Sequence, residues 1–219
     1  MKTNWKPLVA VGVVFAVAVT WGALELMPER TLPVLQPSDL NPALVDASLR
    51  HAERHRILPF TLVNQLGDTV TQADVEGQIL VADFFFTRCP TICPVMTQQL
   101  TRVQAAYADE PSLRILSHSV TPAADSVPIL AAYADRYEAD PSRWWFLTGD
   151  KAHIYDLSRR SYFSCLEDGD GGLQDFVHTE NVALVDPAGR IRGMYDGTSS
   201  TEIDQLIDDI SVLLRATAP

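Results

Sequence analysis

Hydrophobic and polar positions along the chain form blocks that predict strands and helices in alternation. An apolar, aromatic run from Ile79 to Phe86 predicts a buried central strand, and the stretch from Pro94 to Tyr107 predicts a helix directly after it. An apolar run from Leu113 to Val120 and a helical pattern from Ser126 to Tyr137 repeat this unit. Because parallel neighbours in a sheet need crossover helices, the rhythm predicts an α/β fold with a central mixed sheet flanked by helices.

Further elements surround this centre. Phe60 to Asn64 and Thr69 to Thr71 predict a hairpin, and Ala43 to Arg56 predicts a short helix before it. After the centre, the pattern predicts a strand, an amphipathic helix, two strands joined by a turn and a closing helix. In chain order these elements are Trp144–Leu147, Lys151–Tyr162, Asn181–Val185, Ile191–Tyr195 and Thr201–Leu214.

The N-terminus carries an apolar segment without charge from Leu8 to Leu24, preceded by Lys2 and Lys6. Its length is close to the minimum for a membrane-spanning helix, and the positive flank places the N-terminus in the cytoplasm. We therefore expect a cytoplasmic N-terminus over residues 1–7 and a transmembrane anchor over residues 8–27. The remainder of the chain is then expected on the periplasmic, extracytoplasmic side.

Two other interpretations of this apolar segment compete with the anchor. A cleaved signal peptide is disfavoured because the Trp21-Gly22-Ala23 region lacks a clean small-x-small cleavage site. A buried core helix is disfavoured because the segment has no polar face. Beyond the segment, prolines recur among polar residues as far as Pro42, which predicts an extended spacer that lifts a domain off the membrane. We assign residues 28–57 to this Pro-rich linker.

Composition narrows the class of protein. A length of 219 residues with 47% hydrophobic positions supports one well-buried domain with appendages. The net charge of −11 argues against a nucleic-acid partner, since no basic stripe is present to neutralise phosphates, and a cationic partner fits better. Three cysteines are too few for a disulfide-stapled scaffold. We interpret Cys165 as a buried apolar residue, and the other two as a redox or metal site.

The close pair Cys89 and Cys93 lies on the predicted turn from the central strand into its helix. Backbone N–H groups and the positive end of the helix dipole favour thiolate over thiol at such a turn, so both sulfurs should be good nucleophiles and soft metal ligands. Burial of both as small core residues is disfavoured by Pro90, Pro94 and the helix start. A dithiol at the first central strand-to-helix turn is typical of a thioredoxin-like fold.

Two chemistries remain open for the pair. In the redox hypothesis the cysteines cycle between dithiol and disulfide, because their separation across a helix start is within disulfide range. In the metal hypothesis both thiolates bind one soft ion; two sulfurs suit linear Cu(I), and an added imidazole makes a trigonal site that also holds Cu(II). His178 is the candidate imidazole, because its loop precedes a strand that should neighbour the central one. We interpret His118 and His153 as structural histidines.

Four segments together resemble the SCO/SenC family of membrane-anchored, thioredoxin-fold copper proteins that help assemble the copper A centre of cytochrome c oxidase. They are FFFTRCPTICPVM, HSVTPAADS, RWWFLTGDK and HTENVALVDPAGRIRGMYDG. The resemblance runs from about Leu58 to Leu214, and we assign residues 58–216 to a thioredoxin-like SCO/SenC domain. It implies that Cys89, Cys93 and His178 bind copper and that the two cysteines also form a reversible disulfide.

The same resemblance implies a copper metallochaperone rather than an enzyme, with Cu(I) or Cu(II) bound. Its implied partners are the copper-bearing subunit of cytochrome c oxidase and a copper donor or thiol reductase. Two positions depart from the family pattern: Val177 stands where an acidic residue often precedes the ligand histidine, and Thr121 replaces the aspartate of S-V-D-P, while Asp125 remains. The alternative function is a thiol–disulfide oxidoreductase that keeps oxidase cysteines reduced, in which Cys89 attacks and Cys93 resolves.

Overall fold

The chain divides into two compact units, Met1–Thr31 and Leu32–Pro219. The computed structural model describes residues 19, 21, 30–46, 48–164 and 179–217. The predicted cytoplasmic N-terminus and nearly all of the predicted anchor, residues 8–27, lie outside this described part. Within the described part, no helix combines the length and the apolar character that a bilayer crossing requires.

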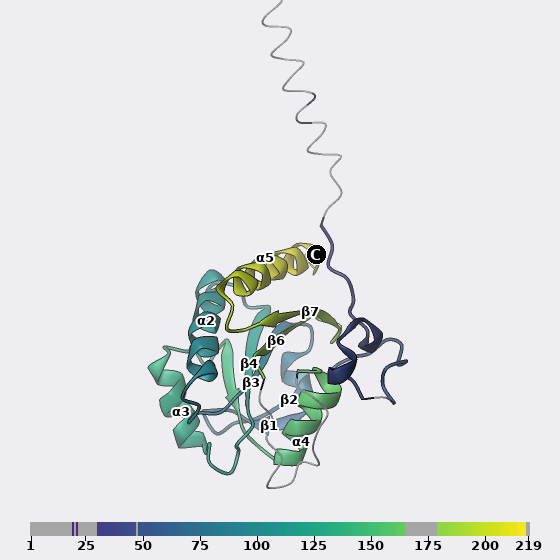
Figure 1. Ribbon diagram of the computed structural model, residues 1–219. Coiled ribbons are helices and arrows are strands. Elements are labelled where there is room, and N and C mark those ends of the chain that lie inside the picture. The colour runs from purple at the N-terminus through teal and green to yellow at the C-terminus, as the bar shows by residue number, and fades with distance from the viewer. Residues whose placement is uncertain (1–18, 20, 22–29, 47, 165–178, 218–219) are drawn as a thin grey trace, which may run out of the picture. The chain divides into compact units, whose positions relative to one another are not determined.

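A five-stranded mixed sheet forms the centre of the second unit (Figure 1). Strand β3, Ile79–Phe85, lies in the middle, with β4, Leu113–Ser119, and β5, Trp144–Leu147, running parallel to it on one side. On the other side, β6, Asn181–Val185, pairs antiparallel with β3, and β7, Ile191–Asp196, pairs antiparallel with β6. The predicted mixed α/β sheet is therefore confirmed, and β5 and β6 have the predicted bounds.

Strand β3 is buried along its whole length because both faces of the sheet are covered. Alternate side chains of a strand point to opposite faces, and here they enter two separate core clusters. Ile79, Val81 and Phe85 join one cluster, whereas Leu80, Ala82 and Phe84 join the other. This double burial explains why the strand appears in the sequence as a continuous apolar run rather than an alternating one.

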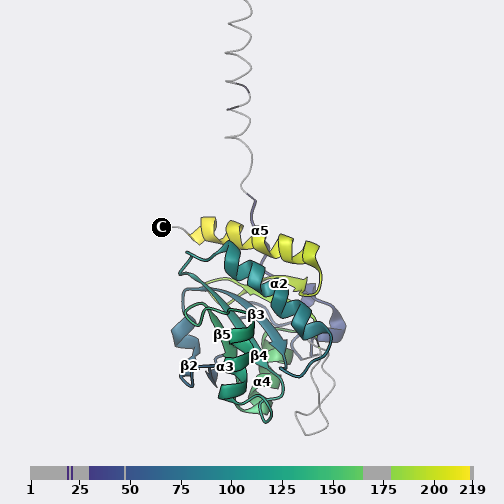
Figure 2. The ribbon, with the colours of Figure 1, turned by 90° about the vertical axis from the view of Figure 1, so that its left-hand side faces the viewer.

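Three helices cover the first face of the sheet, and a hairpin with a short helix covers the second. Helices α2, Ile92–Ala106, α3, Val127–Arg136, and α5, Ser200–Thr217, supply buried side chains to the first core cluster. Figure 2 shows α2 and α5 side by side, and the two helices are in contact. The predicted hairpin is confirmed as β1, Thr61–Val63, and β2, Thr69–Thr71.

The helix predicted from Lys151 to Tyr162 changes its form halfway. Helix α4 covers Lys151–Asp156, and a π-helical turn, η4, covers Leu157–Ser161. The Tyr162 N–H donates to the Leu157 carbonyl at 2.8 Å, which is the five-residue step of a π-helix. Leu157 and Tyr162 are both fully buried. The wider turn brings these two side chains to the same face, which an α-helix would not do.

The region predicted as a linker and short helix packs on the domain from Leu32 onward. No α-helix forms among the described residues between Ala43 and Arg56, where a 3-10 turn, η2, covers Pro42–Leu44. Val45 leaves that turn in an extended conformation and is buried against Phe163 and Ile191. The helical prediction is wrong here because burial of Val45 outweighs local propensity.

The same N-terminal stretch, residues 32–57, is fastened to the outer edge of the sheet. The Leu35 N–H donates to the Ile191 carbonyl at 2.9 Å, and the Arg192 guanidinium donates to the carbonyls of Leu32 and Pro33. Strand β7 is an edge strand, so the Leu35 hydrogen bond pairs a backbone carbonyl of its exposed edge. Where the sequence predicts an extended spacer, Leu32, Pro33 and Leu35 contact the edge strand of the domain.

A buried carboxylate fixes the turn between β6 and β7. Asp186 accepts hydrogen bonds from the backbone N–H groups of Ala188 and Arg190, and from the side chains of Arg190 and Arg192. Burial alone would raise the pKa of Asp186, but the hydrogen bonds and charges of the two arginines outweigh it and hold the pKa below its usual range. The native state therefore favours the ionised carboxylate.

The Asp186→Ala variant is expected to lose about 3 kcal/mol of unfolding free energy at pH 7, because two arginines lose a buried partner. Since the folded pKa is depressed, this stabilisation is full above about pH 4, the unfolded value, and is lost as the pH falls through the folded value. Urea unfolding of native and variant protein at pH 7 and pH 3 checks this. Asp204→Ala, which removes an exposed partner of Arg102, should cost less than about 1 kcal/mol. An equal loss for Asp186→Ala at both pH values would contradict the assignment.

Candidate functional site

Cys89 and Cys93 lie where the chain leaves the central strand and enters the first helix. Strand β3 ends at Phe85, and the Cys89 N–H donates to the Phe86 carbonyl at 3.2 Å in the turn that follows. Helix α2 begins at Ile92, so Cys93 occupies its first turn. The predicted position of the pair at a strand-to-helix turn is therefore observed.

The two thiols are free and are oriented by the helix start. The Cys93 N–H donates to the Cys89 Sγ at 3.4 Å, and the Thr91 hydroxyl lies 4.0 Å from the same sulfur. A backbone N–H of a helix first turn stabilises negative charge on the atom that it faces. Cys89 is therefore held against the helix N-terminus.

Both cysteines are buried, contrary to the interpretation that disfavoured this. Cys89 is 6% exposed and Cys93 is 2% exposed. Cys93 begins a buried stripe on α2 that continues through Met96, Thr97 and Leu100, at the spacing of one helix face. The flanking prolines do not prevent burial because the helix turns this face toward the core.

Burial and hydrogen bonding act differently on the two thiols. For Cys89, burial raises the pKa, but hydrogen bonds from Cys93 and Thr91 outweigh it and leave the pKa lowered. For Cys93, burial raises the pKa to about 12, helped by the hydrogen bond with Cys89 and the nearby charges of Cys89 and Asp83. The expectation that both sulfurs are good nucleophiles is thus met by Cys89 only.

A buried carboxyl on β3, which the sequence interpretation missed, contributes to this asymmetry. Asp83 accepts a hydrogen bond from the Ser117 hydroxyl at 2.5 Å, and that hydroxyl accepts one from the Trp144 indole at 2.9 Å. Burial raises the pKa of Asp83 to about 7, although the Ser117 hydrogen bond opposes the shift. The signal in the sequence is a single aspartate inside an otherwise apolar strand.

The turn before Cys89 is tied to the next strand. Thr87 donates to the Asp125 carboxylate through its backbone N–H at 3.2 Å and its hydroxyl at 2.6 Å. Ser119 and Thr121 donate their hydroxyls to the same carboxylate, at 2.6 and 2.9 Å. Asp125 thus links the dithiol turn to the end of β4 and to the loop that follows it.

The predicted third ligand, His178, lies outside the described residues, as do Val177 and Cys165. In the described part of the chain, no group of three or more histidine, cysteine or acidic side chains is arranged to hold a metal ion. The predicted copper site is therefore represented there by its two sulfurs. A thiol pair on a helix start is a soft donor set, which fits a soft ion.

His118 lies away from the two sulfurs. It stacks on Phe84, with ring centroids 4.8 Å apart, and Phe84 faces the core cluster opposite the one that contains the cysteines. Its Nδ1 lies 3.1 Å from the Asp83 carbonyl, and burial lowers the pKa of His118 to about 4. His118 is thus a neutral, buried side chain, as a structural histidine should be.

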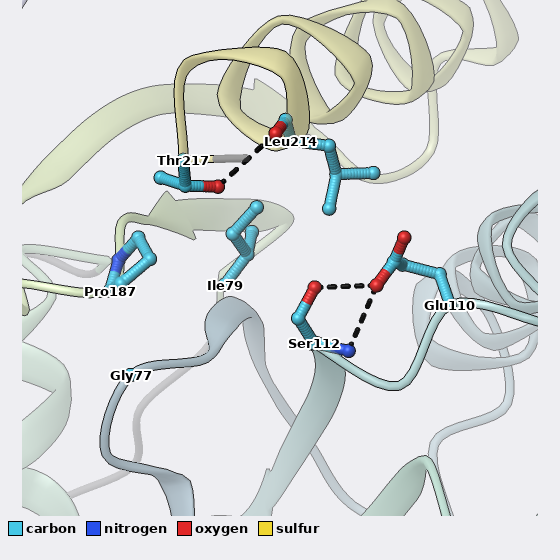
Figure 3. Close-up of a pocket in the computed structure, with 7 residues that line it drawn as sticks. All are labelled: Gly77, Ile79, Glu110, Ser112, Pro187, Leu214 and Thr217. Atoms are coloured by element: carbon cyan, nitrogen blue, oxygen red, sulfur yellow. Dashed lines mark hydrogen bonds between the residues drawn. The ribbon is translucent and has the colours of Figure 1, made fainter. Parts of the chain in front are cut away.

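A pocket of about 470 Å³ lies at the other end of β3 (Figure 3). Its lining residues are Gly77, Ile79, Glu110, Ser112, Pro187, Leu214 and Thr217. Glu110 accepts hydrogen bonds there from the backbone N–H and the hydroxyl of Ser112, at 3.0 and 2.5 Å. Because β3 begins at Ile79 and the cysteines follow its carboxyl end, this pocket is separate from the dithiol.

Comparisons with known proteins match the part of the chain that contains the sheet and the dithiol. The family model described as SCO1/SenC matches residues 50–215. The SCO1 protein homolog of Bacillus subtilis is 34% identical over 158 residues, which cover 71% of this chain and 81% of that protein.

Two solved structures extend the likeness. BsSco, described as a member of the Sco family of cytochrome c oxidase assembly proteins with a disulfide switch, superposes with a TM-score of 0.62 at 33% identity, over 73% of this chain and 93% of that one. The ScoI protein of Bradyrhizobium japonicum, solved with copper bound, gives a TM-score of 0.59 at 25% identity, over 73% of this chain and 99% of that one.

Alkylation should distinguish the two thiols. In the reduced, folded protein at pH 8, iodoacetamide is expected to modify Cys89 at least about tenfold faster than Cys93, because thiolate is the reactive form and the pKa of Cys93 is about 12. Peptide mass spectrometry over a time course measures the two rates. In the urea-unfolded protein the rates should converge, whereas equal rates in the folded protein would contradict the asymmetry.

Proposed function

This chain belongs to the SCO1/SenC family, and on that premise we propose that it is a copper metallochaperone for cytochrome c oxidase. Copper is its cargo, bound by the thiolates of Cys89 and Cys93 and the imidazole of His178 and passed to the copper A site of an oxidase subunit. The observation that carries the proposal is the dithiol held on the first turn of α2. The relatives involved in oxidase assembly and solved with copper support it.

The dithiol has the chemistry that this cargo needs. Two thiolates attract Cu(I) strongly, and a site with few ligands leaves a coordination position through which another protein's thiols can enter. The lowered pKa of Cys89 makes one thiolate readily available. The raised pKa of Cys93 means that copper must displace a tightly held proton, so binding releases that proton and strengthens with rising pH.

The sheet register supports His178 as the third ligand. Strand β6 pairs antiparallel with β3, with Ala183 opposite Ala82, so the beginning of β6 lies toward the end of β3 that leads to the cysteines. Gly197 lies between residue 180 and helix α2 and shows how closely they pack: a Cβ at Gly197 would lie 3.0 Å from the Glu180 carbonyl oxygen and 3.2 Å from Met96 Cγ. Residue 180 is therefore near the first turns of α2, and His178 precedes it by two positions.

The proposal includes a place for the protein in the cell. Residues 8–27 act as a transmembrane anchor, and the domain lies on the periplasmic, extracytoplasmic side. The uncharged apolar run behind Lys2 and Lys6 supports this orientation. On the same side, a copper donor would supply copper to the dithiol, or a thiol reductase would reduce its disulfide.

Substitution of His178 tests the ligand set. His178→Ala is expected to lower Cu(I) affinity by at least about tenfold and to abolish the Cu(II)–thiolate absorption, because a trigonal site loses one of three ligands. Competition with a Cu(I) chelator and absorption spectroscopy measure these effects. His51→Ala, at an exposed histidine, should change neither quantity. Unchanged stoichiometry and spectrum in His178→Ala would remove His178 from the site.

The asymmetry of the thiols favours a second candidate, a thiol–disulfide oxidoreductase that keeps oxidase cysteines reduced. In this reaction the Cys89 thiolate attacks a substrate disulfide, forms a mixed disulfide and releases one substrate thiolate. Cys93 then attacks the Cys89 sulfur and releases the second substrate thiolate, leaving the protein with a Cys89–Cys93 disulfide. A lowered pKa at the attacking thiol and a buried resolving thiol suit these roles.

The Cys93→Ser variant separates the two candidates. Under the oxidoreductase hypothesis it should accumulate a mixed disulfide between Cys89 and an oxidase subunit, because the resolving thiol is missing. Non-reducing electrophoresis after acid quenching detects the adduct, and Cys89→Ser is the control that should trap nothing. Absence of an adduct, together with oxidase assembly rescued by added copper, would argue for the metallochaperone alone.

A further inference from the structure

Asp125 is a buried carboxylate whose hydrogen-bond donors among the described residues are all neutral. The side chain is 1% exposed. It accepts four hydrogen bonds, from the backbone N–H of Thr87 and the hydroxyls of Thr87, Ser119 and Thr121. A carboxylate placed away from water needs several such donors, so this arrangement is a specific local structure rather than an incidental contact.

The donors come from three segments that meet at this carboxylate. Thr87 lies in the turn after β3, two positions before Cys89. Ser119 is the last residue of β4, and Thr121 opens the loop that leads to α3. Beside them, the Val120 N–H donates to the Phe85 carbonyl at 2.9 Å, so β3 and β4 remain paired up to this point.

We propose that Asp125 is a positioning residue for the dithiol: by holding Thr87 at two points, it fixes the backbone that enters Cys89 and keeps the Cys89 sulfur against the Cys93 N–H. The backbone N–H and the hydroxyl of Thr87 bind different oxygens of the carboxylate, which fixes orientation as well as distance. The turn itself adds the bond from the Cys89 N–H to the Phe86 carbonyl. Positioning of the dithiol therefore depends on a residue outside the cysteine motif.

A carboxylate is the strongest acceptor for these four donors, because its oxygens carry negative charge. The amide of asparagine has the same shape, but its one accepting oxygen is neutral and binds donors more weakly than a carboxylate oxygen, and its NH2 group can only donate. The Asp125→Asn variant therefore preserves volume and weakens these four hydrogen bonds, which we call the Asp125 clamp. Thr87→Val removes one of the two bonds to the turn, again at nearly constant volume, and leaves the Thr87 backbone bond in place.

The thiol–disulfide equilibrium with glutathione tests the proposal without copper. One oxidised glutathione is reduced to two glutathione thiols as Cys89 and Cys93 lose two electrons and two protons to form a disulfide. Because the clamp holds the reduced pair in place, Asp125→Asn should raise the oxidation equilibrium constant by roughly fivefold, the effect of one lost hydrogen bond of ordinary strength. Thr87→Val should raise it in the same direction, by less.

A double variant distinguishes positioning from a general loss of stability. If Asp125 acts through Thr87, then Asp125→Asn with Thr87→Val should match Asp125→Asn alone in the glutathione equilibrium. The matched control is Asp209→Asn, a buried aspartate on α5 that accepts from Tyr195 and Gln205, and it should leave this equilibrium unchanged. Thermal unfolding of all variants shows whether stability and redox effects separate. An unchanged equilibrium constant in folded Asp125→Asn and Thr87→Val, or an equal shift in the control, would overturn the proposal.

Copper binding provides the second readout, and this part rests on the proposed function. Asp125→Asn should lower Cu(I) affinity by about tenfold, the usual effect of losing a group that orients a metal ligand. If the native protein binds no copper, the metallochaperone function fails while the glutathione experiment still decides the role of Asp125. If the native protein binds copper and Asp125→Asn binds it equally tightly with an unshifted glutathione equilibrium, the positioning role fails alone.

Discussion

Burial of β3 on both faces is the constraint on which the rest of the structure depends. A strand covered on both sides must be apolar along its length, must lie in the middle of the sheet and must leave the core at its carboxyl end. The chain leaves it into a tight turn and then into α2, so the cysteines are placed by the strand before them and the helix after them. Asp83, the one acidic residue in that strand, is in turn buried, where it acts on Cys93 and has the Ser117 hydroxyl as its hydrogen-bond donor.

Much of the fold could be predicted because its signals are local. The bounds of β5 and β6 follow from short apolar runs between turn residues, and the dithiol turn follows from the boundary between an apolar run and a helical pattern. The wrong predictions depend on contacts distant in the sequence. Val45 leaves its helical pattern because Phe163 and Ile191 bury it, and the π-turn at Leu157–Ser161 follows from packing of Leu157 and Tyr162.

The candidate site also has features that the sequence predicts and features that only the structure shows. The sequence identifies which sulfurs are involved and where they lie, because the cysteine pair stands at the boundary between an apolar run and a helical pattern. It does not reveal that the pair is buried and unequal, since that depends on how the face of α2 turns and on Asp83 from the neighbouring strand. The inequality suits both candidate functions: a reactive outer thiolate can receive an ion or open a disulfide, and a protected inner thiol completes either process.

If residues 8–27 anchor the protein as proposed, the contacts of Leu32, Pro33 and Leu35 with β7 would limit how far the domain can move from the membrane. A spacer over residues 28–57 would allow a tethered domain to sample on the order of 100 Å when extended. With Leu32, Pro33 and Leu35 held on the sheet edge, only residues 28–31 remain between the proposed anchor and the domain, a span of about 14 Å at most. Such a short tether would raise the effective concentration of the dithiol for acceptors close to the bilayer and would exclude those farther away. Partner choice would then be set partly by height above the membrane, in addition to chemical recognition.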